Sequence, residues 1–175
     1  MNPAPSGNVE RLDSAFDTML DSIRGHAFPD RVFYTASRLG DWSLIWHLIN
    51  SAGLATGWRS GNQFVRLAAF IAAESLLVNQ GIKRLFRRAR PSFSGDHPHH
   101  VRRPSTSSFP SGHATAATVA AMLLSADHTR WWPVWVLIAL VVTISRPYVR
   151  VHHASDIVGG VVVGAVLGSA FLLIR

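Results

Sequence analysis

The chain has 175 residues, of which 48% are hydrophobic and only 15% are charged. Together with a mean hydropathy of +0.19, this composition argues against a water-soluble enzyme and favours a single membrane domain. The formal net charge of +7 fits nucleic acid, an anionic membrane surface or a phosphate-bearing substrate. The absence of cysteine excludes disulfides, thiolate metal sites and a thiol nucleophile.

The N-terminal part is expected to contain a disordered end followed by an amphipathic helix. Residues 1–8 are rich in Pro, Ser, Gly and Asn, as is typical of an end without its own structure. Within residues 9–23, apolar side chains recur at helical spacing with charged residues between them, which predicts a helix lying on the membrane or on the domain. No apolar core typical of a secretory signal follows the first charges, so internal segments are expected to drive membrane insertion.

Apolar stretches separated by polar or Gly/Pro-marked breaks follow along the rest of the chain. They are residues 41–58, 64–82, 114–126, 131–144 and 157–174. A bilayer core of about 30 Å needs about 20 apolar residues, so the third and fourth stretches must extend into their loops to span it. We therefore predict an all-α fold, an integral-membrane bundle of about five transmembrane helices plus the N-terminal amphipathic helix, forming one domain over residues 9–175.

Two features inside the predicted helices concern packing. Gly160, Gly164 and Gly168 form a stripe on one face of the last helix, which favours close approach of another helix of the same chain over a dimer contact. Glu74 lies at membrane depth, where a carboxylate must face the protein interior. It can pair with a cation of the functional site or hydrogen-bond between helices, and the sequence does not decide between them.

Helix counting places two polar loops on the same face of the membrane, because residues 83–109 join the second and third helices and residues 145–156 join the fourth and fifth. These loops and the helix start that follows the first of them collect most residues with catalytic or anion-binding capability. They are Lys83, Arg90, Ser111, Gly112, His113, Arg146, His152 and Asp156.

These residue types suit the transfer of a phosphoryl group. Its three equatorial oxygens need fixed cations and N–H donors, which Lys83, Arg90 and Arg146 can supply together with a helix start at Ser111. Two histidines allow a division of labour, in which one attacks phosphorus and the other protonates the leaving oxygen.

The pair of His152 and Asp156 has the spacing of an oriented nucleophile. If the last helix begins before them, residues i and i+4 share one face, and the carboxylate can accept a hydrogen bond from one ring nitrogen. The opposite nitrogen is then free to attack. His153 would point elsewhere on that helix, about 100° away.

Three motifs, K-x6-RP, PSGH and SR-x5-H-x3-D, resemble in order and without substitution the signature of the type 2 phosphatidic acid phosphatase (PAP2) superfamily. That superfamily also includes bacterial acid phosphatases and vanadium haloperoxidases. Each motif alone is weak evidence, but the three together are highly specific. The resemblance is close over residues 83–156, the predicted catalytic core, and it implies a membrane lipid phosphatase that works through a phosphohistidine.

The resemblance also implies a role for each motif residue. His152 would be the nucleophile, Asp156 would orient it, and His113 would be the general acid and later the base for water. The residues implied for phosphate binding are Lys83, Arg90, Ser111, Gly112 and Arg146. No metal or other cofactor is expected in this chemistry.

Other interpretations stay open beside this one. His97, His99 and His100 resemble a metal-binding cluster, but a solvated or substrate-entry loop is favoured because no helix or strand fixes their geometry. Arg84, Arg87 and Arg88 are interpreted as ordinary membrane-flanking charges. At the level of function, a haloperoxidase, a non-specific acid phosphatase and a catalytically silent membrane scaffold remain the alternatives.

The sequence favours one orientation in the membrane but does not select the lipid substrate. Apart from the phosphate-binding residues, arginines concentrate on the side of the two site loops, which favours a site on the cytoplasmic face of a bacterial plasma membrane. The expected partners are membrane lipids and a lipid phosphate, with no nucleic acid and with room for a homo-oligomer. The motifs do not select among a polyprenyl-phosphoryl sugar phosphate, a polyprenyl diphosphate, phosphatidic acid and phosphatidylglycerophosphate.

Overall fold

The computed structural model describes residues 7–92 and 101–174, and within these ranges the chain forms helices and connecting loops without strands. The all-α prediction is therefore confirmed. Most of the predicted disordered end, residues 1–6, lies outside the described residues, and so do His97, His99 and His100. Asn8, predicted to be disordered, is the first residue of a helix.

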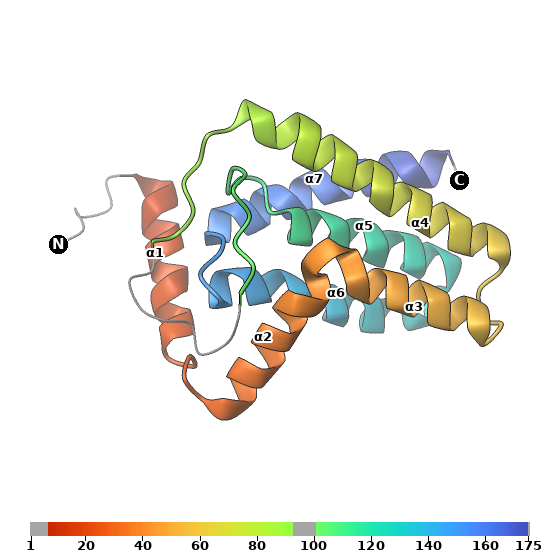
Figure 1. The fold of residues 1–175 in the computed structure, drawn as a ribbon, viewed down its shortest axis with the longest axis horizontal. Helices are drawn as coiled ribbons and strands as arrows, with labels where there is room; N and C mark the ends of the chain where they lie inside the picture. The colour runs from red at the N-terminus through yellow and green to blue at the C-terminus, as the bar shows by residue number, and fades with distance from the viewer. Residues whose placement is uncertain (1–6, 93–100, 175) are drawn as a thin grey trace.

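Two short helices precede the bundle. The predicted amphipathic helix is α1, Asn8–Asp21, which lies across one end of the bundle in Figure 1. Its apolar residues Val9, Leu12 and Met19 are exposed by 54–56% and face away from the protein. A second helix that the sequence analysis missed, α2 at Ala27–Gly40, packs mainly on α6.

The remaining helices run roughly side by side along the long axis of the molecule (Figure 1). They are α3 (Leu44–Ala55), α4 (Gly61–Leu76), α5 (Gly112–Asp127), α6 (Trp132–Tyr148) and α7 (Ala154–Leu173). After α4 the chain continues through a π turn at Leu77–Gly81 and a 3₁₀ turn at Ile82–Leu85. Ser60 and Gln63 form a reciprocal capping box at the start of α4, while Ser111 caps α5.

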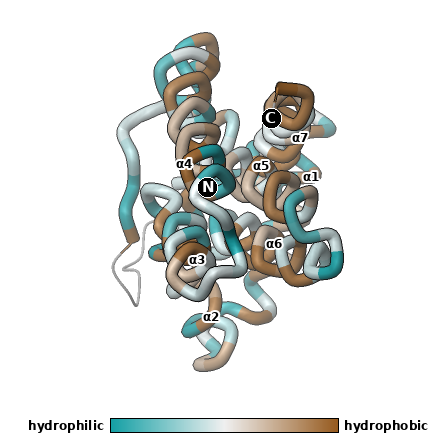
Figure 2. The backbone as a smooth tube through the Cα atoms, turned by 90° about the vertical axis from the view of Figure 1, so that its right-hand side faces the viewer, coloured by the Kyte–Doolittle hydropathy of each residue, from teal (hydrophilic) through white to brown (hydrophobic). Residues whose placement is uncertain are grey.

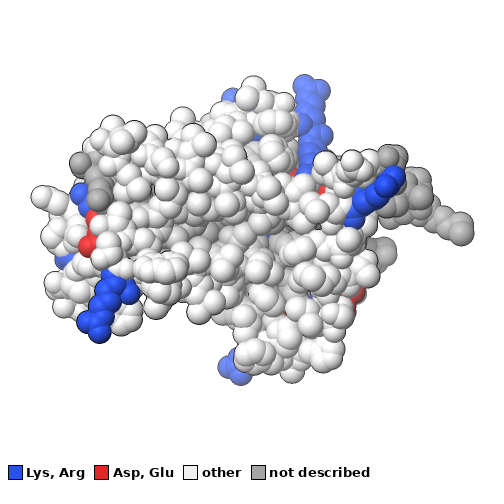
Figure 3. Space-filling view, turned by 180° about the vertical axis from the view of Figure 1, so that it is seen from behind, with Lys and Arg blue, Asp and Glu red and all other residues white. Residues whose placement is uncertain are grey.

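Three helical segments in the described part of the chain are long and apolar enough to cross a membrane. They are Gly61–Leu85, Thr129–Tyr148 and Ala154–Leu173. The helices α3 and α5 have only 12 and 16 residues, so the prediction of five spans is not confirmed. Hydrophobic residues predominate along α6 and α7 in Figure 2, and Figure 3 shows Lys and Arg at the two ends of the molecule with an uncharged band between them. The chain is therefore an integral membrane protein.

The helix α5 is the centre of the bundle. Its small residues between Ala114 and Leu124 are nearly all buried, and it contacts α4, α6 and α7. The glycine stripe of α7 packs on it. A Cβ added at Gly160 would lie 2.6 Å from the Ser111 carbonyl oxygen, and one at Gly164 would lie 2.7 Å from the Thr115 carbonyl oxygen. The prediction that this stripe serves internal packing is confirmed, because only glycine lets the two backbones approach so closely.

Candidate active site

The two polar loops meet at the same end of the bundle, as helix counting predicted. The end of α4, the start of α5, the end of α6 and the start of α7 lie together beside α1 in Figure 1. A cavity of about 690 Å³ opens there. The predicted site residues in its wall are Lys83, Gly112, His113, Arg146 and His152. Segments separated by up to about 70 residues thus share one polar chamber.

His152 is buried, with 3% of its surface exposed, and its two ring nitrogens face different partners. Nε2 lies 3.1 Å from Nη1 of Arg90, while Nδ1 lies 3.6 Å from Oδ2 of Asp156 and 3.4 Å from Oγ of Ser108. A guanidinium only donates hydrogen bonds, so Nε2 must be the acceptor. This assigns the ring proton to Nδ1, on the Asp156 side, and leaves a lone pair on Nε2.

Burial keeps the His152 imidazole neutral. Burial lowers the pKa of His152 to about 3, and although the Asp156 hydrogen bond works in the opposite direction, the nearby charges of Arg146 and Arg90 add to the lowering. A neutral imidazole is the form whose lone pair can attack an electrophile.

Asp156 is fully buried and is held by several donors. The Ser108 hydroxyl donates to Oδ2 at 2.5 Å, the His153 backbone N–H donates to Oδ2 at 2.8 Å, and Arg88 donates to Oδ1 at 2.6 Å. The helical reasoning behind the His152–Asp156 pair was wrong in one respect. Because α7 begins only at Ala154, the two residues do not share a helix face, and the contact arises because Asp156 folds back over the helix start as a cap.

Of the three cations implied for phosphate binding, Lys83 and Arg146 line the cavity and Arg90 lies beside His152. Lys83 is 6% exposed, and its Nζ would lie 3.7 Å from a Cβ added at Gly112, so this ammonium is next to the start of α5. Arg146 is 1% exposed, donates from Nη1 to the Ser37 hydroxyl, and has an Nε with no hydrogen-bond partner among the described residues. Ser111 is the N-cap of α5, which adds the helix dipole to these charges.

Arg90 is fixed by backbone carbonyl groups. It donates to the carbonyl oxygens of Pro104, Val151, Thr106 and Ser107 at 3.0–3.3 Å. Burial lowers the pKa of Arg90, Asp156 opposes this effect, and Arg103 adds to it. The backbone carbonyl groups therefore hold the guanidinium beside Nε2 of His152. The Nη1–H that points at Nε2 has to turn to a phosphate oxygen before the lone pair can attack.

His113 lies in the first turn of α5 and has a carboxylate partner. Its Nε2 is 3.3 Å from Oδ1 of Asp41 and 3.3 Å from the Ser37 carbonyl oxygen. Burial alone would raise the pKa of Asp41, but its hydrogen bond with His113 and the charges of His113, Arg146 and Arg102 hold that pKa below its usual value. Burial and the charge of Arg146 lower the pKa of His113 to about 4, while the ionised Asp41 and the Ser37 carbonyl group oppose this lowering and favour the protonated form.

Several residues of the site escaped the sequence analysis. Ser108 and Asp41 support the two histidines, and His47 lines the cavity. Arg88, interpreted as a membrane-flanking charge, contacts Asp156 directly. Glu74 is 2% exposed, lines the cavity, and has an Oε1 without a hydrogen-bond partner in residues 7–92 and 101–174. It therefore belongs to the cavity wall and forms no ion pair within 4 Å there.

Comparison with known proteins agrees with this geometry. The sequence profile of the PAP2 superfamily matches residues 64–175. A Mycobacterium tuberculosis protein named decaprenylphosphoryl-5-phosphoribose phosphatase is 35% identical over 137 residues, which cover 76% of this chain and 73% of the relative. A protein of the same name from Mycolicibacterium smegmatis is 39% identical over 129 residues, covering 71% and 67%.

Solved structures share the fold over nearly the whole chain. The transmembrane PAP2-type phosphatidylglycerolphosphate phosphatase of Bacillus subtilis superimposes with a TM-score of 0.73 at 26% identity, covering 98% of this chain and 88% of the other. Aquifex aeolicus LpxE superimposes with a TM-score of 0.71 at 22% identity over 99% of both chains. The second likeness bears on the fold alone.

Proposed function

The chain belongs to the PAP2 superfamily, and we propose that this membrane phosphatase removes the terminal phosphate of a polyprenylphosphoryl pentose phosphate through a phosphohistidine on His152. The observation that carries the mechanism is the lone pair of His152 Nε2, which faces Nη1 of Arg90 at 3.1 Å, beside a cavity whose wall includes Lys83 and Arg146. The substrate class is proposed from the activity of the mycobacterial relatives, whose matches cover at least two thirds of both chains.

In the first half of the reaction, Nε2 of His152 attacks phosphorus and the bond from phosphorus to the ester oxygen breaks. Lys83, Arg90 and Arg146 carry the charge on the equatorial oxygens, and the backbone N–H groups at Gly112 and His113 add donors at the start of α5. His113, held by Asp41, donates its proton to the leaving oxygen. The positive charge that forms on the His152 ring is balanced by Asp156 through Nδ1–H.

In the second half, water attacks phosphorus and the P–N bond breaks. The neutral His113 formed in the first half now accepts a proton from the water, while the bond electrons return to Nε2 of His152. Inorganic phosphate leaves, and both imidazoles regain their starting protonation. Each proton that His113 donates is thus recovered, so the cycle is balanced without a further reactant.

The polar groups of the cavity wall favour a substrate with hydroxyl groups next to the phosphate. Glu74 offers an unpaired carboxylate oxygen, and His47, Asn79 and Gln80 add polar groups to the same wall. A pentose next to the reacting phosphate has hydroxyl groups that can donate to Glu74, whereas the diacylglycerol of phosphatidic acid has no free hydroxyl to offer. An unpaired buried acceptor thus favours a sugar phosphate over phosphatidic acid.

The site is proposed to open on the cytoplasmic face of a bacterial plasma membrane. Outside the phosphate-binding set, the arginines on the site side are Arg11, Arg24, Arg31, Arg38, Arg84, Arg87, Arg88, Arg102, Arg103 and Arg150, and those expected on the other side are Arg59, Arg66, Arg130 and Arg175. This bias supports an inward-facing site. Arg87→Cys, a single cysteine in a chain without others, should not react with an impermeant maleimide in intact cells; labelling from outside would reverse the orientation.

A lipid panel tests the activity and the substrate class together. Phosphate release is measured in detergent with chelator present, using a polyprenylphosphoryl pentose phosphate, a polyprenyl diphosphate, phosphatidylglycerophosphate and phosphatidic acid. We expect the first to have the highest kcat/KM, His152→Ala to abolish turnover, and the control His153→Ala to retain it. A preference for phosphatidic acid would contradict the substrate proposal, and equal loss in the two histidine variants would contradict the choice of nucleophile.

A further inference from the structure

The amphipathic helix α1 carries a buried carboxylate that the proposed mechanism does not use. Asp13 is 8% exposed, although its neighbours Leu12 and Glu10 are exposed. An acidic residue is rarely buried without a partner, because its charge loses solvation. The inner side of α1 therefore meets a charged partner at Asp13, while Val9, Leu12 and Met19 point outward.

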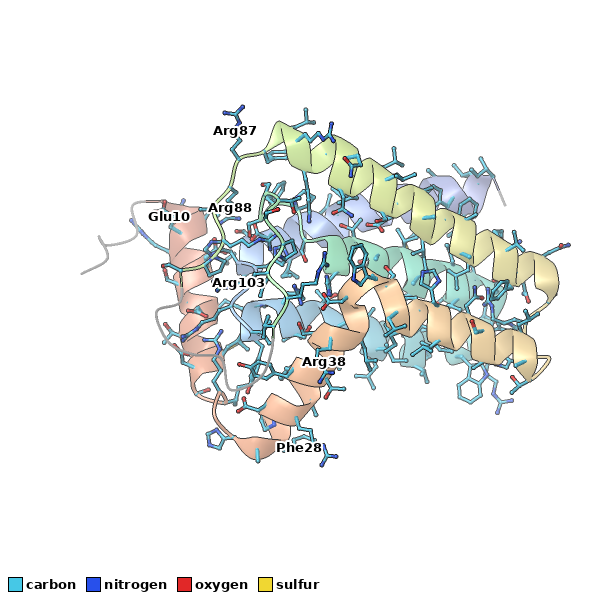
Figure 4. The ribbon with its side chains drawn as sticks, in the orientation of Figure 1. Glu10, Phe28, Arg38, Arg87, Arg88 and Arg103 are labelled. Carbon is cyan, nitrogen blue, oxygen red and sulfur yellow. The ribbon has the colours of Figure 1, made fainter. Side chains whose placement is uncertain are left out.

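One of the residues that contact Asp13 also contacts Asp156 of the His152–Asp156 pair. The Asp13 carboxylate accepts hydrogen bonds from the backbone N–H and the hydroxyl of Ser155 at 2.8 Å each, and from Nη2 of Arg88 at 2.6 Å. Nη1 of Arg88 donates to Oδ1 of Asp156 at 2.6 Å and to the Ser155 hydroxyl at 2.7 Å. Figure 4 shows Arg88 in the space between α1 and the site loops, whereas Arg87 points away from the molecule.

Arg88 is thus shared between two carboxylates, one on α1 and one at the active site. Oδ1 of Asp156 is taken by Arg88, and Oδ2 serves Ser108, the His153 N–H and the His152 ring. If Asp13 did not balance Arg88, the whole guanidinium charge would act on Asp156. The carboxylate would then be a poorer acceptor for Nδ1–H of His152, and would balance the imidazolium less well.

We propose that Asp13 is a positioning residue for the catalytic pair, which acts through Arg88 to set the orientation and the charge of Asp156. The seating of α1 against the start of α7 is then a condition for a fully active His152. This inference rests on the proposed role of His152 as the nucleophile.

The test uses Asp13→Asn with the matched control Glu10→Gln, which removes the same charge from an exposed position of the same helix (Figure 4). We expect Asp13→Asn to lower kcat about 10-fold with KM changed less than about 2-fold, because a supporting hydrogen-bond partner is lost and no substrate contact is touched. Glu10→Gln should leave both constants unchanged. A KM effect larger than the kcat effect, or equal losses in the two variants, would overturn the inference.

A spectroscopic readout separates positioning from a loss of stability. The Nδ1–H proton resonance of His152, assigned by its absence in His152→Asn, reports the strength of the hydrogen bond on the Asp156 side. Asp13→Asn should move it toward a weaker hydrogen bond, and Arg88→Gln, which removes the cation, should move it in the opposite direction; Arg87→Gln is the matched control. Shifts in the same direction, or none, would overturn the inference.

Two provisions keep the outcome interpretable. If Asp13→Asn is not recovered folded, Arg88→Gln against Arg87→Gln decides the question alone, since an unmoved His152 resonance in Arg88→Gln contradicts the inference. If His152→Ala remains active, the proposed function itself fails. If His152→Ala is inactive and the resonance does not move, only the role of Asp13 is refuted.

Discussion

Each end of the bundle buries an arginine, but among the residues that the structure describes only one of the two arginines forms an ion pair with a carboxylate. At the end away from the cavity, Arg59 donates to Asn50, to the Gln63 carbonyl oxygen and, at 3.1 Å, to Asp127. Arg66 reaches the same carboxylate at 2.5 Å. At the site end, Arg146 donates to the Ser37 hydroxyl and otherwise faces the cavity. A buried cation with its own carboxylate supports the fold, whereas one aimed into a cavity is available for an anionic ligand.

Among the changes that compare the two ends of the bundle, removal of the cation at the site end is expected to have the largest effect. Arg146→Ala should lower kcat/KM by about 10³-fold, because a fixed charge on the transferring phosphoryl group is lost. Arg146→Lys should recover part of this loss, since it restores the charge without the planar fork. Steady-state kinetics on the lipid substrate provide the measurement, and a loss below about 10-fold in Arg146→Ala would show that the arginine is structural.

The corresponding change at the far end should affect stability instead. Arg59→Ala breaks the buried ion pair with Asp127 and is expected to cost about 3 kcal/mol of unfolding free energy. The turnover per folded molecule should stay within about 2-fold of wild type. Thermal unfolding in detergent measures the stability, and the activity of the folded fraction measures the turnover. A variant of unchanged stability that has lost activity would contradict the structural role of Arg59.

Removal of the Asp41 carboxylate, which supports His113, should have a smaller effect on kcat and should shift the pH–rate profile in a known direction. General acid catalysis typically contributes about 10²–10⁴-fold to a rate. Because Asp41→Asn weakens the acid without removing it, this variant should lower kcat by less, about 30-fold. Because the Asp41 carboxylate favours protonated His113, its loss should move the basic limb of the pH–rate profile to lower pH. A pH profile of kcat checks this. An unmoved basic limb would remove Asp41 from the proton-transfer step.

Asp41 should also contribute to stability in a pH-dependent manner. Its pKa is held below the usual value in the folded protein, so its stabilising contribution is present above the unfolded pKa of about 3.9 and is lost as pH falls through the folded pKa. The stability difference between wild type and Asp41→Asn should therefore shrink in acid. A difference that grows toward low pH would contradict the ion pair with His113.

The smallest expected effect is a difference in stability between substitutions at two glycines of α7, Gly160 near the site end of the helix and Gly168 near the far end. A Cβ at Gly160 would meet the Ser111 carbonyl oxygen at 2.6 Å, whereas one at Gly168 would meet the flexible Met122 side chain, with Sδ at 2.6 Å. Gly160→Ala should cost about 2 kcal/mol and also disturb the helix start at the site, while Gly168→Ala should cost less than about 1 kcal/mol. Equal melting temperatures for the two variants would show that the stripe is not tightly packed near the site.

The sequence was informative where chemistry and spacing repeat a known pattern. Five of the eight residues singled out from the motifs lie in the cavity wall, and helix counting predicted that both loops open at one end. The glycine stripe predicted close helix packing for a steric reason that holds in any context.

The sequence was silent where tertiary contacts decide. Asp41 follows Gly40 at the end of α2, in a bend where Trp42 and Ser43 adopt left-handed φ angles of 57° and 58°. Gly40 marks the end of the helix, but nothing in the sequence connects this bend to His113. Ser108 and Arg88 lie in a loop without periodicity, so nothing in their spacing connects them to Asp156. The prediction of about five membrane spans is not confirmed for a related reason: the centre of a bundle is as apolar as a membrane span, so the apolar sequence of α5 does not show whether this helix crosses the bilayer.

Trapping the covalent intermediate tests the central claim most directly. Rapid acid-free quenching of the enzyme with substrate labelled in its terminal phosphate should leave one phosphoryl group on the peptide that contains His152, stable in alkali and lost in acid. The label should be absent from His152→Ala and present in the His153→Ala control. Labelling of His113, labelling that survives acid, or turnover by His152→Ala would contradict the account.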